Sequence, residues 1–447
     1  MATLTVQVDF SYQTDSKSLD SIKSCLSQMI RLGKIDIFAT SASTLEKLFL
    51  DLPKSAPQLH TFCITLNRFS ESEFTIPEEF LTDTERLQCV HLQGCKIGWD
   101  SPLLTGLTRL TLHDSLKDNA STIQFLHALQ RMPSLTNLDL EDSIPHDSGE
   151  TSAYPVVDLP CLQLFRISSY VGAVTTALRH ITVLPTVVMC LECKDTQFTQ
   201  FTQIDLSDFL SVLAAKFLSL LVFRSLRVTD LLDGIRCQAA VQEFVCPPSQ
   251  LDLTLTWGTS LLPNDPGSYA TILTAVFDSM TLRALTHLHL STPLTIANTW
   301  INISAKLPLL EWVHLSCTAH PFLTALVHKT KGAENSIAAY RTVCFPKLRY
   351  ICLNGNDFTG KHFNSISVDT LMECLMERCE RNAEVQELYL ENCYNLSEDD
   401  VEGLREIVVN VERDGIEQAF YEPEEERDYD SDGNIIDWDS DYNDYYD

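Results

Sequence analysis

The stretch that decides the fold is an apolar triplet near the end of the chain, Val385-Gln-Glu-Leu388-Tyr-Leu390-Glu-Asn-Cys393. Apolar residues occupy its first, fourth and sixth positions, and polar or aromatic residues stand between them. This alternation predicts a short strand with one buried face, because successive side chains of a strand point to opposite sides. Further on, Ser397 and Asp400 have the spacing of a helix-capping pair, so a helix is expected to follow the strand.

The same triplet recurs along most of the chain, and its first residues are Leu32, Leu59, Leu87, Leu107, Leu135, Leu162, Leu285, Leu310, Leu348 and Val385. A proline often stands two residues before the triplet, as at Pro133 and Pro308. Because proline cannot continue a helix, each unit is predicted to be a helix, a stop and a short strand. Apolar residues at helical spacing support helices at residues 121–132, 172–184 and 269–280.

A second recurring position lies three residues past the last apolar residue of the triplet. It carries a thiol, hydroxyl or amide, at Cys95, Ser115, Ser143, Asn356 and Cys393. Such side chains can hydrogen-bond backbone groups where the chain leaves a strand. The pattern is weak in one region, where regularity is expected to break and strands are expected at 187–191, 223–228 and 251–255.

These observations predict an α/β fold, a leucine-rich-repeat solenoid or horseshoe with a parallel concave sheet and outer helices. We assign residues 1–415 to an irregular array of roughly 13 units, least regular around 185–260, on the basis of this period. Residues 416–447 are assigned to a disordered acidic tail. The alternative is an ordinary α/β domain with several apolar strands, which would not explain why the markers recur together.

Composition restricts the class of function. The chain has 447 residues, 45% of them apolar, so a large core can be buried. Its formal net charge of −29 would repel phosphates, so we expect no nucleic acid as a partner and a basic or mixed-charge protein surface instead. The 15 scattered cysteines are typical of free thiols in a reducing compartment, and no signal peptide or membrane-spanning run is found. We therefore expect no membrane partner and a cytoplasmic or nuclear location.

The repeat units resemble a known family. The Leu-x-x-Leu-x-Leu-x-x-Cys/Asn pattern, the Cys-x-x-Leu-Ser-Glu continuation at Cys393 and the Met-Pro-Ser-Leu-Thr-Asn-Leu-Asp-Leu run at 132–140 are similar to the ribonuclease-inhibitor-like repeats of fungal F-box/leucine-rich-repeat proteins. The resemblance covers residues 4–412. It implies repeats that hold a substrate protein and an F-box that docks a ubiquitin-ligase scaffold. Because residues 4–10 are predicted to form a strand and residues 18–31 a helix, we expect no F-box before the array.

The variable positions within the triplets are predicted to face a groove, because the apolar positions face the core. Exposed tryptophan and tyrosine among polar groups are typical of binding hot spots. The alternative is that these are ordinary polar residues of an amphipathic sheet. We predict a partner-binding face, centred on Trp312, Tyr350 and Tyr389, that comprises His91, Arg109, His113, Asp139, His287, His289, Trp312, His314, Tyr350, Asn354, Glu387 and Tyr389.

Metal ligands occur at two places in the sequence. His289 and His314 would be neighbours on adjacent strands, and Cys352 would lie near them. A row of histidines on a polar face needs no ion, so no metal and no cofactor is assigned there. In the tail, a disordered segment is the preferred interpretation. Weak calcium binding is the alternative, because the spacing of a calcium-binding loop is present at Asp428, Asp430, Asp432 and Asp439.

Function is expected to be binding rather than catalysis. The sequence contains no His-Glu-x-x-His, Gly-x-Ser-x-Gly or glycine-rich dinucleotide motif. The first hypothesis is a protein–protein interaction module for substrate recognition, similar to ubiquitin-ligase adaptors. A stand-alone scaffold or inhibitor with no ubiquitin role is the second, and a calcium-responsive binder is the third.

Overall fold

The structure is a computed structural model, and it describes residues 4–11, 16–50, 52–67, 73–81, 83–115, 120–145, 154–194, 203–231, 233–242, 249–256, 266–291, 297–316, 319–327, 343–360 and 365–415. The assignment of residues 416–447 to an acidic tail, with its four calcium-loop aspartates, lies outside the described residues. The described residues form a mixed α/β fold that is dominated by one large sheet.

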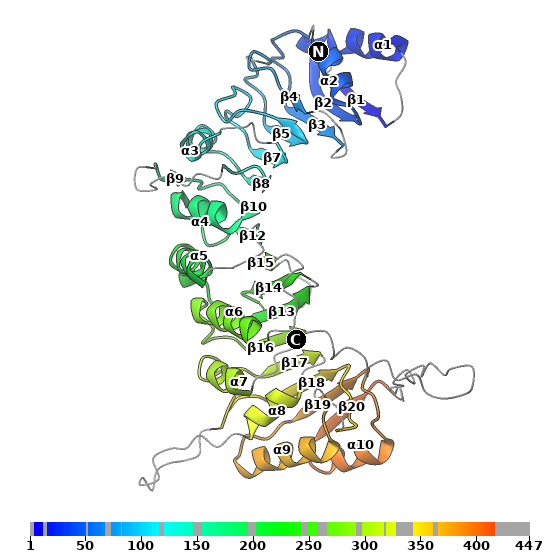
Figure 1. The fold of residues 1–447 in the computed structure, drawn as a ribbon, viewed down its shortest axis with the longest axis vertical. Coiled ribbons are helices and arrows are strands. Elements are labelled where there is room, and N and C mark those ends of the chain that lie inside the picture. Colours follow the sequence, from blue (N-terminus) through cyan, green and yellow to red (C-terminus); the bar gives the residue numbers. More distant parts are fainter. Residues whose placement is uncertain are drawn as a thin grey trace, which may run out of the picture.

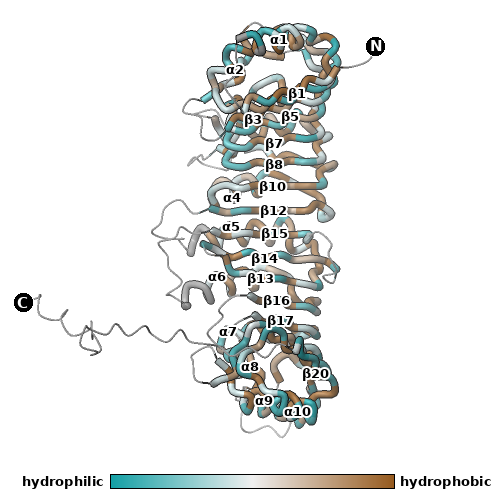
Figure 2. The backbone as a smooth tube through the Cα atoms, turned by 90° about the vertical axis from the view of Figure 1, so that its right-hand side faces the viewer, coloured by the Kyte–Doolittle hydropathy of each residue, from teal (hydrophilic) through white to brown (hydrophobic). Residues whose placement is uncertain are grey.

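Sixteen strands form this sheet, which runs from one end of the molecule to the other. Figure 2 shows most of them stacked one above another like rungs. In order across the sheet they are β1 (Leu4–Phe10), β2 (Leu32–Ala39), β3 (Thr61–Leu66), β5 (Cys89–Gln93), β7 (Arg109–His113), β8 (Asn137–Glu141), β10 (Leu164–Tyr170), β12 (Val188–Lys194), β15 (Leu251–Thr256), β14 (Gly234–Ala240), β13 (Ser225–Leu231), β16 (His287–Ser291), β17 (Trp312–Ser316), β18 (Tyr350–Asn354), β19 (Glu387–Glu391) and β20 (Asn410–Arg413).

Two small strand pairs and the helices complete the fold. The pairs are β4 (Phe74–Thr75) with β6 (Cys95–Lys96), and β9 (Val157–Asp158) with β11 (Ile181–Thr182). The α-helices of the described residues are α1 (Ser16–Leu26), α2 (Ala42–Phe49), α3 (Thr122–Gln130), α4 (Val171–His180), α5 (Gln203–Lys216), α6 (Pro266–Ser279), α7 (Ala297–Ser304), α8 (Ala319–Leu326), α9 (Val368–Glu380) and α10 (Glu398–Arg405).

The array is bent, with strands along the inner side and helices α3 to α7 along the outer side (Figure 1). This arrangement is compatible with a solenoid. No helix among the described residues is both long and apolar enough to cross a membrane. The predicted strand at residues 4–10 and the predicted helices before the prolines are confirmed, and Ser397 caps α10 together with Asp400.

The core lies between the sheet and the helices, and the apolar residues of the triplets form its sheet side. In β8, Leu138 and Leu140 are fully buried, whereas the residues on either side of each are partly exposed. The same alternation occurs in β5, β16, β17 and β19. Burial of one such leucine stabilises the fold by roughly 2 kcal/mol. The apolar triplet positions therefore hold the sheet against the helices and leave the opposite face, here called the open face, to the variable positions.

The turn after the strand is built alike in several units. The second residue past the triplet has a positive φ, as at Gly94, Asp114, Asp142, Gly355 and Asn392. The next side chain then hydrogen-bonds the backbone, as the sequence predicted. The Ser115 hydroxyl donates to the Leu92 and His113 carbonyls at 3.0 and 2.7 Å. The Cys393 thiol donates to the Leu353 carbonyl at 3.4 Å.

The expectation of an all-parallel sheet is wrong at one strand. β14 is antiparallel to both β13 and β15, while every other neighbouring pair of described strands in the large sheet is parallel. The three strands predicted within the irregular region are confirmed as β12, β13 and β15, and β14 was not predicted. It forms a hairpin with β13, and the hairpin stands between β15 and β16. Regularity is lost here because the chain turns back instead of crossing over through a helix.

Candidate functional site

The predicted groove residues all lie on the open face of the sheet. Each occupies a variable strand position, and all are partly exposed except Arg109, which is exposed. They do not form one patch, however. Five strands separate the N-terminal group on β5 to β8 from the C-terminal group on β16 to β19. At about 4.8 Å per strand, the six steps from β8 to β16 span about 29 Å.

Two residues of the N-terminal group, His113 and Asp139, belong to a row of paired polar and charged side chains. His113 Nε2 lies 3.2 Å from Asp139 Oδ1, and Arg166 Nη1 donates to Asp139 Oδ2 at 3.1 Å. Arg236 Nε donates to Asp252 Oδ1 at 2.8 Å farther along the sheet. These five residues, here called the charged row, line part of a cavity of about 340 Å³. Because their charges are already paired, the row ties neighbouring strands together.

Sequence reasoning missed both arginines of the charged row, for different reasons. Arg166 lies at a variable position of the triplet that begins at Leu162, so the pattern that revealed its neighbours was present there too. Arg236 lies on β14, which has no such triplet. Cys190 lines the same cavity, and burial raises the pKa of its thiol. Cys193 is buried on the opposite face of β12.

The C-terminal group contains an aromatic patch, defined here as His287, Trp312, Tyr350 and Tyr389. The strand register places His287 beside Trp312 and Trp312 beside Tyr350. The rings of His287 and Trp312 have centroids 5.9 Å apart. The Tyr389 hydroxyl donates to Glu387, and this hydrogen bond raises the pKa of Tyr389 to about 12. The aromatic patch therefore offers partly exposed rings beside a hydrogen-bonded carboxylate.

A second row runs beside the aromatic patch. His289 and His314 are stacked, with ring centroids 4.1 Å apart and planes 8° apart, so the predicted neighbourhood of these histidines is confirmed. Burial, and then the nearby His314 and Arg227, lower the pKa of His289 to about 4. Cys352 follows His314 on the next strand and is only 2% exposed. Burial raises the pKa of its thiol to about 12.

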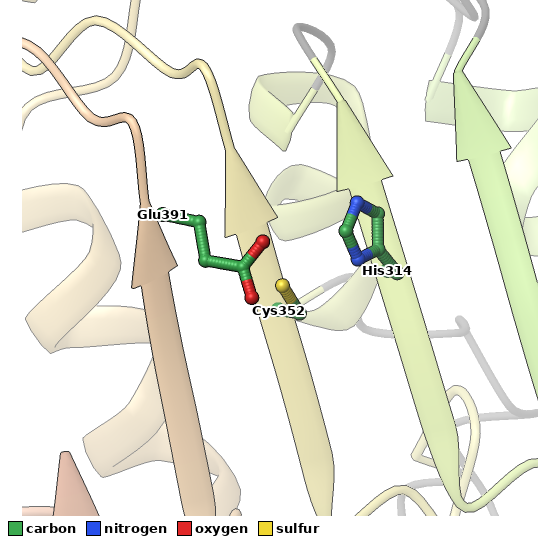
Figure 3. A group of neighbouring side chains, drawn as sticks. All are labelled: His314, Cys352 and Glu391. Carbon is green, nitrogen blue, oxygen red and sulfur yellow. The ribbon is translucent and has the colours of Figure 1, made fainter. Parts of the chain in front are cut away.

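Three metal-ligating groups converge at the end of this row. One ligand atom each from His314, Cys352 and Glu391 lies within 4.8 Å of the other two. Figure 3 shows them on three neighbouring strands, with the Glu391 carboxylate reaching toward the thiol. Sequence reasoning paired His314 with Cys352 but missed Glu391. Its strand position faces Asn354, one alternation beyond Cys352, so only the length of its side chain brings it into the cluster.

Comparison with known proteins does not identify the chain. No family model matches it, and no curated protein matches it. The resemblance to F-box/leucine-rich-repeat proteins therefore stays a prediction, which rests on the repeated triplet in the sequence.

Proposed function

We propose that this chain is a leucine-rich-repeat solenoid that binds a protein partner on the open face of its sheet. The repeat assignment is supported by the recurrence of one design: a triplet strand, a turn with positive φ and a side chain that hydrogen-bonds the backbone. Arrays of this kind present a long inner surface to their partners. The repeat pattern is most similar to that of F-box/leucine-rich-repeat proteins. We therefore propose the role of a substrate-recognition protein of this type, located in the cytoplasm or nucleus.

The observation that carries the binding proposal is the aromatic patch. Trp312 and Tyr350 are cross-strand neighbours on β17 and β18, and Tyr389 on β19 lies diagonal to Tyr350, opposite Cys352, on the face that the helices do not cover. Their rings are partly exposed, although tryptophan and tyrosine usually bury most of their surface. Tryptophan and tyrosine are also the residues over-represented among interface hot spots. A partner that covers the aromatic patch would bury the aromatic surface that the fold itself leaves exposed.

Charge indicates the chemistry of the partner. Glu387 and Glu391 border the aromatic patch, and the whole chain carries a net charge of −29. Such a field attracts a basic or mixed-charge surface and accelerates its association at low salt. Lysine and arginine side chains can in addition stack on tryptophan and tyrosine faces. We therefore propose a protein partner with basic residues around an apolar centre.

The test is affinity capture with the full chain and the variant Trp312→Ala/Tyr350→Ala, followed by affinity measurement on each purified partner. Truncating a hot spot costs about 2 kcal/mol or more, so we expect binding at least about 30-fold weaker. Met376→Ala is the matched control, since Met376 is 45% exposed on α9, in the helix layer of the same region. Circular dichroism checks that all three proteins are folded. Equal affinity of the double variant and the control for every partner would refute the proposal.

The same affinity capture distinguishes an adaptor from a stand-alone scaffold, because the two roles predict different co-purifying proteins. An adaptor of the F-box type would co-purify with a ubiquitin-ligase scaffold as well as with its substrate. If the wild-type chain captures a ligase scaffold, we expect the aromatic-patch variant to lose the substrate and keep that scaffold. Absence of any ligase component with the wild-type chain would leave the scaffold or inhibitor as the function.

A further inference from the structure

We infer that His314, Cys352 and Glu391 form a zinc-binding site on the open face of the sheet. The site lies beside the aromatic patch, but it can be tested without any partner. Failure of the proposed function would therefore leave it standing, and its own failure would leave the proposed function standing. The three residues come from three successive parallel strands, β17, β18 and β19, whose register is continuous.

The distances suit a metal after small movements of the side chains. The three ligand atoms already lie within 4.8 Å of one another. Zinc takes nitrogen, sulfur and oxygen ligands at about 2.0 to 2.3 Å, which places two tetrahedral ligands about 3.5 Å apart. The largest separation must therefore shrink by at most about 1.3 Å, which rotation about the side-chain bonds of Glu391 and His314 can supply. The backbone of the sheet need not move.

Neighbouring side chains hold two of the ligands in place. Asn354 Nδ2 on β18 donates to Glu391 Oε2 at 3.1 Å, and this hydrogen bond holds the carboxylate of β19 against β18. The Ser316 hydroxyl contacts His314 Nε2 at 3.3 Å, and His289 stacks on the same ring. Contacts of this kind orient the ligands of metal sites and tune their affinity. The cluster thus has both the groups that would bind the ion and partners that position them.

The types of ligand select the metal. A thiolate and an imidazole favour zinc and similar transition metals, whereas calcium and magnesium prefer sites made of oxygen ligands. Binding must convert the Cys352 thiol to a thiolate, and the released proton passes to solvent as the sulfur–metal bond forms. Three protein ligands leave a fourth position, which water or a side chain of the partner can fill. Because Glu391 is accessible to solvent, that position opens toward the open face.

The experiment is a titration of the full, reduced chain with Co²⁺, followed by displacement with Zn²⁺. We expect a thiolate-to-cobalt charge-transfer band that saturates at one equivalent and disappears when zinc is added. Cys352→Ser and Glu391→Gln should each weaken zinc binding at least about 100-fold, the upper end of what a change in the outer shell causes. Cys89→Ser is the matched control, because Cys89 is a partly exposed thiol on the same face but far from the cluster.

The outcomes separate this site from casual metal binding. Exposed thiols such as Cys25, Cys161 and Cys379 can bind cobalt without any built site. A charge-transfer band that survives in Cys352→Ser, or that falls equally in Cys89→Ser, would overturn the inference, as would a wild-type chain with no band. Circular dichroism checks each fold. If Cys352→Ser does not fold, Glu391→Gln decides the result alone, because that change lies at an accessible position.

Discussion

Arg378 shows how a single buried side chain can hydrogen-bond a turn that lies outside the helices and strands. It is 1% exposed on α9, and its guanidinium donates to the carbonyls of Cys344 and Phe345 at 2.9 and 3.0 Å. Phe345 has a φ of 51°, so this turn cannot continue into a helix or strand. Burial lowers the pKa of Arg378 to about 10, which leaves the side chain protonated at neutral pH. The charge therefore stays available to the two carbonyls.

Replacement of Arg378 by methionine should lower the free energy of unfolding by about 3 kcal/mol, because two buried carbonyls would lose a charged donor. Urea denaturation followed by circular dichroism measures the loss. Arg405→Met is the control, since Arg405 makes its ion pairs with Glu398 and Glu402 at the surface, where such pairs contribute at most about 1 kcal/mol. Similar losses for the two variants would show that Arg378 contributes no more than a surface arginine.

The direction in which side chains face was predictable from sequence, whereas their grouping was not. Strict alternation within each triplet placed Asp139 and Trp312 on the same face, and the structure agrees. Their separation depends on how many strands stand between β8 and β17, which no local pattern encodes. Glu391 joined the metal-ligand cluster for a similar reason, since its carboxylate reaches across to Cys352 from a position that faces another residue.

Strand β14 was missed because its signal differs from that of the other strands. Its buried residues include Ile235, Cys237 and Ala239, which alternate correctly but lack the leucine triplet and the preceding proline. Gly234 begins the strand, and a Cβ there would lie 2.2 Å from the Leu255 carbonyl oxygen. The glycine therefore lets β14 approach β15 closely, which a search for apolar periodicity does not detect.

Gly234→Ala should destabilise the protein by about 1 to 3 kcal/mol, because the added methyl group must push rigid backbone apart. Thermal unfolding measures the change. Gly98→Ala provides the comparison, since its Cβ would meet only Asp100, whose exposed side chain can move away. If both substitutions lower the melting temperature equally, the close approach of β14 to β15 is not what requires a glycine.

The hairpin of β13 and β14 makes the strand layer longer relative to the helix layer. Helix α5 packs against both α4 and α6, so the outer layer is continuous past the hairpin. Neighbouring strands are about 4.8 Å apart and packed helices about 8 to 10 Å, so an array with one helix per strand must bend toward its strands. Two additional strands without helices lengthen the inner layer. The array should therefore bend less at the hairpin than elsewhere.

Deletion of residues 224–248 should make the molecule shorter and more strongly curved. Two missing strands account for a loss of about 10 Å in length. Because the strand layer would then be shorter relative to the helix layer, the molecule should also bend more, which brings its ends closer still. Small-angle X-ray scattering measures the largest dimension, with circular dichroism and light scattering to check a folded monomer. A folded variant that shortens by only the width of two strands would argue against this account of curvature.

Strand order also bears on the sequence in which the large sheet can assemble. With β13 and β14 set aside, the strands of the large sheet follow one another across it in the order in which the chain makes them. Each of these strands can therefore join the sheet beside the one made just before it. The hairpin interrupts this succession at a single place among the described strands, because β12 pairs with β15 and not with the intervening β13. The hairpin can thus join the growing sheet only after β15 has been made.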